Sequence, residues 1–257
     1  MSVRPGIADV LATERRAGPH DVNATLGQLA MLPLAAPRSL DRFSVGRALA
    51  GRGVESEPFA WNARNAFRSV ALGALRRCLS GPGEAPLEAV RGEVERLAVA
   101  GRRDPVDPRS LPTFLAEADD GTRAAVVERA TNLATDVLVQ LPWSSFTARP
   151  VLAPVLEPIT VGRLTLRARA DLELTHASGS TLLLVVPGTP ALRAVDELAY
   201  VALVAGLDPR RAPRVNRVVG WWPRSGEVRE VVLGPGALQA GLEAVASTLR
   251  ASQAQAA

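Results

Sequence analysis

Apolar residues recur at the spacing of a helix through the first 148 residues, and loops with proline and glycine separate the segments that show this period. These segments are 21–32, 61–79, 86–101 and 123–141. In the second segment, one helix face collects Phe67, Val70, Ala71, Ala74, Leu75 and Cys78. A proline-rich connector at 104–112 precedes the last segment. The pattern therefore predicts a helical N-terminal region.

Beyond Pro150 the period changes from that of a helix to that of a strand. From Arg163 to Leu174 apolar and polar residues alternate without a break, which predicts one strand with a buried face and a solvated face. A turn at 176–180 leads into the apolar run 181–188, which is typical of a strand covered on both sides.

The remaining segments complete a mixed α and β order. A stretch at 155–161 fits a further strand, and the chain then continues after residue 190 with a helix, two strands and a last helix, at 191–207, 214–222, 227–234 and 236–252. The predicted order from Arg123 onward is α-β-β-β-α-β-β-α.

Composition excludes several kinds of chemistry. The single cysteine, Cys78, has no partner for an internal disulfide, and two histidines beside it do not make a zinc site. All 30 basic residues are arginine, as a GC-rich genome favours, so no mechanism that needs a lysine ammonium can operate. The net charge of +4 is small for 257 residues. No apolar run is long enough to span a bilayer and residues 1–16 lack a signal-peptide core, so we expect a cytoplasmic protein without a membrane partner.

The element order and two local motifs resemble the PD-(D/E)XK nuclease superfamily, in particular its RecB-type exonuclease domains. The first motif is LRARADLEL, in which Asp171 matches the metal-binding aspartate of that family. The second is DELAYVALVAGL, in which Tyr200 matches the tyrosine of a Gln-x-x-x-Tyr motif and Asp196 stands at the glutamine. The resemblance covers residues 123–250 and leaves the N-terminal half unexplained.

The resemblance also implies an acid, any residue and then lysine at the end of the third strand. Val185 stands at the acid and Pro187 at the lysine, and no acid or lysine lies between His176 and Leu192. Metal-dependent phosphodiester hydrolysis needs carboxylates around the ion and a cation near the developing charge. We therefore predict a degenerate nuclease with its active site lost: no enzyme, no metal and no cofactor.

These observations predict an α+β protein in two parts. A helical N-terminal region, residues 1–120, packs on a restriction-endonuclease-like mixed β-sheet flanked by helices, residues 121–257. Two roles fit Asp171: it pairs with an arginine or a neighbouring strand, or it remains as a relic carboxylate in a groove. Tyr200 is either a core residue or a contact residue.

A nuclease fold without its metal site can still hold DNA, because phosphate contacts supply most of the affinity. The candidate nucleic-acid contacts are two arginine groups, Arg210, Arg211, Arg214 and Arg217 before a strand, and Arg64 and Arg68 one helical turn apart. Both groups also fit a solvated surface. Trp221 and Trp222 point to opposite faces of a strand, which predicts one buried and one partly exposed indole. Our first hypothesis is a protein that binds DNA or organises a DNA-handling complex, and the alternative is a protein-interaction or regulatory protein without nucleic-acid contact.

Overall fold

The computed structural model describes residues 17–34, 36–52, 60–80, 83–103, 107, 109–212 and 214–256. The chain forms two compact units, one from residues 1–56 and 142–257 and the other from residues 57–141. The sequence predicts a division at residue 120, but the helix at 120–140 packs with the helices before it. The described residues 17–34 and 36–52 belong to the sheet unit. Residues 1–16, which lack a signal-peptide pattern, lie outside the described residues.

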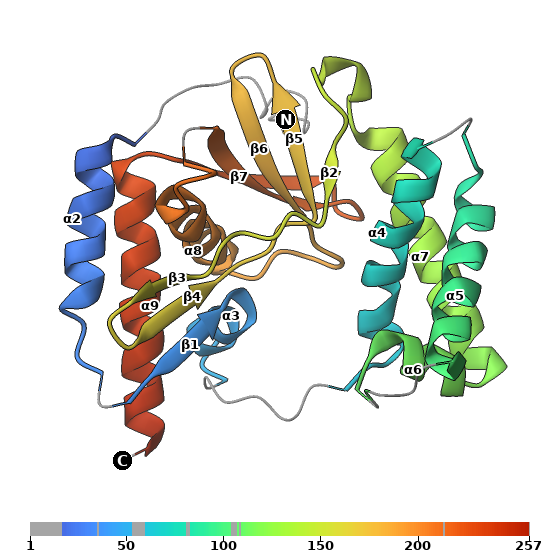
Figure 1. The fold of residues 1–257 in the computed structure, drawn as a ribbon, viewed down its shortest axis with the longest axis horizontal. Coiled ribbons are helices and arrows are strands. Elements are labelled where there is room, and N and C mark those ends of the chain that lie inside the picture. The colour runs from blue at the N-terminus through green and yellow to red at the C-terminus, as the bar shows by residue number, and fades with distance from the viewer. Residues whose placement is uncertain are drawn as a thin grey trace. The chain divides into compact units, whose positions relative to one another are not determined.

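The sheet unit is an α+β fold with helices flanking its strands, which confirms the predicted fold class (Figure 1). The sequence predicts one mixed sheet, whereas the described residues form two. Its helices are α2 (Pro19–Ala30), α3 (Arg42–Leu49), the 3₁₀ helix η1 (Trp143–Ser145), α8 (Ala194–Leu207) and α9 (Pro235–Ala256). Its strands are β1 (Arg38–Asp41), β2 (Val151–Leu152), β3 (Ile159–Val161), β4 (Leu164–Arg167), β5 (Leu172–His176), β6 (Gly179–Val185), β7 (Val215–Trp222) and β8 (Glu227–Val232).

The larger sheet has the strand order β2-β5-β6-β7-β8. Its neighbouring strands are antiparallel except for β6 and β7, which run parallel and are joined through α8. A parallel pair needs such a crossover connection. The smaller sheet has the order β1-β4-β3, in which β1 runs parallel to β4 and β3 antiparallel to it.

The core of the sheet unit lies between the sheets and the two long C-terminal helices. α8 is apolar almost all round and accordingly buried from Leu198 to Leu207. It packs against α9, against β7 and against α3, and α2 lies beside α9 (Figure 1). Leu182, Leu184 and Val218 of the larger sheet and Leu164 and Leu166 of the smaller one join the same apolar cluster.

The helical unit contains α4 (Ala63–Ser80), α5 (Pro86–Arg103), α6 (Leu111–Glu117) and α7 (Asp120–Gln140). α6 begins within the connector predicted at 104–112, of which residues 104–106 and 108 are not described. Asp119 caps α7 by accepting a hydrogen bond from the Thr122 N–H at 2.7 Å, and this bond lowers the pKa of the Asp119 carboxyl. The long helices match the apolar periods predicted at 61–79, 86–101 and 123–141.

The strand predicted from 163 to 174 is wrong in one respect: it is two strands in different sheets. β4 ends at Arg167 and β5 begins at Leu172, and between them the chain crosses from the smaller sheet to the larger one. Alternation cannot reveal such a crossing, because the buried side continues through it: Ala168 and Ala170 are both buried. The sequence also missed β1, whose four residues RSLD show no strand period.

Candidate functional site

Asp171, which the sequence resemblance matches to a metal-binding aspartate, lies immediately before β5 and is 5% exposed. Its Oδ2 accepts a hydrogen bond from the backbone N–H of Val185 at 2.7 Å, and its own N–H donates to the Leu183 carbonyl at 2.9 Å. The N–H of Ala170 turns away from β6 and donates to the Pro154 carbonyl instead. The carboxylate therefore accepts the last backbone N–H of β6. It does so at the point where the chain before β5 no longer pairs with β6 through its backbone. Of the two roles that fit Asp171, the structure gives it the contact with a neighbouring strand.

The other two motif positions offer no oxygen or cation beside this carboxylate. Val185 is an apolar side chain 1% exposed, and Pro187 lies in the exposed turn that follows β6. Asp196, at the position of the glutamine, pairs with Arg193 at 2.6 Å in the first turn of α8. Among the residues that the structure describes, no three or more His, Cys, Asp and Glu side chains gather in a group that could hold a metal ion.

Tyr200 joins α8 to the smaller sheet and is completely buried. Its phenol oxygen lies 2.7 Å from the Leu40 carbonyl oxygen and 3.0 Å from the Arg167 carbonyl oxygen, and it accepts a hydrogen bond from the Arg167 N–H at 3.1 Å. Burial raises the pKa of Tyr200, so the phenol stays protonated and remains a donor. Of the two roles considered for this residue, the structure places it in the core.

The first arginine group lies in the loop before β7 and, for Arg217, in β7 itself, and acids engage three of its four members. Arg210 pairs with Glu157 and Arg211 with Glu173. Arg217 pairs with Glu230 at 3.2 Å and is only 3% exposed, so its guanidinium does not reach the surface. Arg214 is exposed. The sequence brings four arginines within eight positions, but in the structure these arginines do not form one open cationic surface.

The second arginine group lies in the other unit, on α4. Arg64 is exposed in the first turn of the helix, whereas Arg68 is partly buried. The two groups therefore belong to different compact units and do not make one site within either of them.

Both tryptophans at the end of β7 are buried, with 2% and 3% of Trp221 and Trp222 exposed. The predicted exposed indole is therefore wrong. Both faces of the larger sheet are covered at this position, so alternation along β7 does not separate a buried side from a solvated one.

Glu173 is a buried acid that the sequence pattern assigns to a solvated face. It accepts a hydrogen bond from the Ser180 hydroxyl at 3.1 Å and pairs with Arg211. Nearby, His176 Nε2 lies 3.2 Å from the Thr181 hydroxyl, and burial together with Arg217 lowers the pKa of the imidazole. These groups partner one another, which is typical of a polar network that stabilises a fold.

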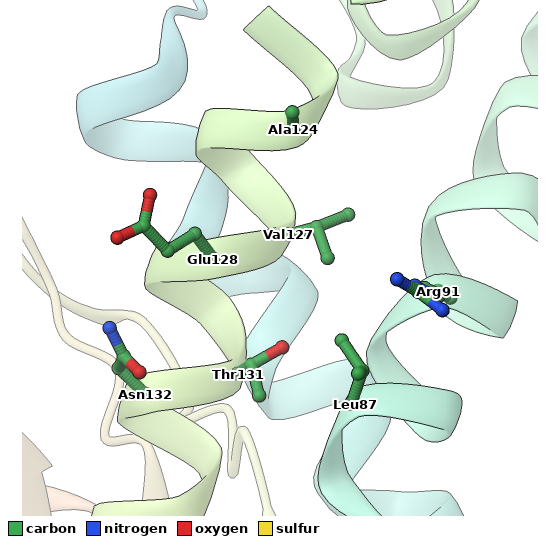
Figure 2. A pocket seen from close by; sticks show the side chains of 7 residues that line it. All are labelled: Leu87, Arg91, Ala124, Val127, Glu128, Thr131 and Asn132. Carbon is green, nitrogen blue, oxygen red and sulfur yellow. The ribbon is translucent and has the colours of Figure 1, made fainter. Parts of the chain in front are cut away.

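The helical unit carries a groove of about 480 Å³ between α5 and α7 (Figure 2). The residues that line it are Leu87, Arg91, Ala124, Val127, Glu128, Thr131 and Asn132. Figure 2 shows Val127 and the Thr131 hydroxyl pointing from α7 toward α5, with Leu87 facing them. Arg91 lies on the α5 side, and Glu128 and Asn132 lie on the far side of α7.

The sequence interpretation did not include this groove, although the chain carries a signal for it. The buried face of α7 consists of Val126, Ala130, Leu133, Ala134 and Val137. Ala124 and Val127 are apolar residues outside that face, one turn apart. A second apolar stripe beside the buried one indicates a helix with a further surface to cover.

No protein-family model matches the chain, and no curated protein matches it. Among solved structures, the crystal structure of SSO0001 is similar over 90% of this chain and 84% of its own, with a TM-score of 0.34 and 10% sequence identity. None of the described helices combines the length and the apolar character needed to cross a membrane.

Proposed function

We propose that this protein is a non-catalytic relative of the RecB-type PD-(D/E)XK nucleases that helps to organise a complex of other molecules. The order of elements supports the resemblance, because three strands of the larger sheet, β2, β5 and β6, precede α8 and the parallel strand β7 follows it. The five strands of the larger sheet lie side by side in the order in which they occur along the chain.

One observation carries the non-catalytic part of the proposal: the Asp171 carboxylate is held by the Val185 N–H. A carboxylate that accepts a backbone hydrogen bond in a buried strand stabilises the sheet. Metal-dependent hydrolysis would instead require it to share an ion with an acid at position 185, where valine offers no oxygen. The same arrangement also explains why an acid remains at position 171 once the rest of the motif is gone.

The contacts of the arginines favour protein partners over DNA. Arg210, Arg211 and Arg217 neutralise acids of their own chain, which leaves them less available to phosphates. DNA binding remains a second candidate, because Arg64 and Arg214 are exposed and phosphate contacts need only such side chains.

Replacing Asp171 tests the structural role of its carboxylate. We expect Asp171→Ala to lower the free energy of unfolding by about 1 to 3 kcal/mol, because the buried Val185 N–H loses its acceptor. Asp171→Asn keeps an acceptor oxygen and should lose less. Urea unfolding followed by circular dichroism measures both effects. Neither the wild type nor a variant should nick plasmid DNA with Mg²⁺ or Mn²⁺, and nicking by the wild type that both substitutions abolish would contradict the proposal.

Chromatography on a DNA column distinguishes a protein partner from DNA as the partner of this chain. We expect the wild type to elute at low salt, at the same position as an Arg64→Ala/Arg214→Ala double variant, because protein partners need neither side chain. These two arginines are chosen because removing the paired Arg211 or Arg217 would also disturb the fold. Retention that falls steeply with salt, with a slope reduced by about 1 for each arginine removed, would favour DNA binding instead.

A further inference from the structure

We propose that the groove between α5 and α7 is the contact surface between two copies of this chain. The copies are related by a two-fold axis across the groove, so that Arg91 of each copy faces Glu128 of the other. This inference goes beyond the proposed function and does not depend on it, because it concerns the helical unit alone.

The apolar lining of the groove gives the contact its driving force. Leu87 is 40% exposed on α5, and Val127 beside it on α7 is only partly covered. Burial of such side chains against a second copy removes apolar surface from water, which is the main favourable term in protein association.

The Thr131 side chain also lines the groove. Its Oγ1 is buried and has no hydrogen-bond partner in the part of the chain that the structure describes. Figure 2 shows it pointing into the groove. Because this oxygen is closed to solvent already in the single chain, the contact between the copies depends on the apolar lining and the charges of the groove and not on this hydroxyl.

The charges at the two sides of the groove determine which molecule fits it. Arg91 and Glu128 are both exposed, and neither is among the ion-paired or hydrogen-bonded residues of the described chain. In a two-fold contact the same surface of both copies takes part, and the axis reverses its direction in the second copy. The basic side of one copy therefore lies over the acidic side of the other. A second copy therefore supplies both opposite charges, whereas the Glu128 carboxylate and the apolar lining disfavour nucleic acid.

Charge reversal tests this arrangement directly. Wild type should show a monomer–dimer equilibrium in sedimentation velocity at micromolar concentrations. Arg91→Glu alone places two like-charged pairs in the contact, and so does Glu128→Arg alone. Each variant should raise the dissociation constant of the dimer by about tenfold or more. An equimolar mixture of the two variants should restore dimers, because every pair across the axis is then opposite in charge.

Arg103→Glu is the matched control for Arg91→Glu. It makes the same charge change on the exposed C-terminal turn of α5, outside the groove. This variant should leave the dissociation constant of the dimer unchanged. Circular dichroism of each variant verifies that the helices are folded. A wild type that stays monomeric overturns the proposal, whether the groove is covered by another partner or by none. Folded single variants that dimerise like wild type, or whose mixture stays monomeric, overturn it equally.

Discussion

Replacing Gly241 by alanine is expected to lower the free energy of unfolding of the sheet unit by about 3 kcal/mol. Gly241 lies in the second turn of α9, where that helix packs against α8. A Cβ at this position would lie 2.5 Å from the Ala199 carbonyl oxygen and 2.6 Å from Leu203 Cβ. Both atoms belong to the framework of a buried helix and cannot swing away, so the two helices would have to separate. The loss outweighs the gain of about 1 kcal/mol that alanine brings to a helix interior.

Gly27→Ala is the matched control for this prediction. Gly27 is also a helix-interior glycine of the sheet unit, but a Cβ there meets no heavy atom within 4 Å. We expect this variant to be more stable than wild type by about 0.5 to 1 kcal/mol, because alanine reduces the freedom of the unfolded chain. Urea unfolding monitored by far-ultraviolet circular dichroism measures both variants. If Gly241→Ala were as stable as Gly27→Ala, the close approach of α8 and α9 would be wrong.

Tyr200→Phe is expected to cost about 2 to 3 kcal/mol, because it leaves buried backbone groups of Leu40 and Arg167 without their phenol partner. The phenylalanine ring keeps the packing volume, so the loss reports the hydrogen bonds that join α8 to the smaller sheet. Thermal or urea unfolding gives the difference from wild type. A variant as stable as wild type would show that these three contacts contribute nothing.

Alkaline titration provides a second readout of Tyr200, which is the single tyrosine of the chain. Burial raises its pKa in the folded protein, whereas in the unfolded chain it ionises near pH 10. The unfolded state therefore loses a proton first, and stability falls as the pH rises above about 10. The ultraviolet absorbance of tyrosinate should increase together with unfolding, and Tyr200→Phe should be less sensitive to alkaline pH. Tyrosinate that forms near pH 10 while circular dichroism stays native would contradict this.

The sequence predicts the long helices well because each has an apolar face with a clear period. α7 and α8 follow apolar patterns read directly from the chain, and β6 follows a continuous apolar run. Elements without such a period were missed or merged. β1 is formed by pairing with β4, a contact between residues far apart in the chain, and four residues carry no local signal for it.

The side chains missing from the candidate site could be predicted from the sequence, but the contacts of the site could not. The residues Val185 and Pro187 show directly that the acid and the lysine of the motif are missing. The hydrogen bond from Val185 to Asp171 depends on where the chain leaves one sheet for the other, which alternation does not reveal. The ion pairs of Arg211 and Arg217 likewise depend on acids of other strands, so counting arginines overestimated the positive charge open to a partner.

The pairing of β1 with β4 also determines when the protein can be completed during synthesis. β1 ends at Asp41 and pairs in register with residues up to Arg167, so this strand cannot pair until residue 167 has left the ribosome. Residues 57–141 make their contacts within one continuous segment and can fold during that interval. The nascent chain should therefore gain protease resistance first in the helical unit and only later in the sheet unit.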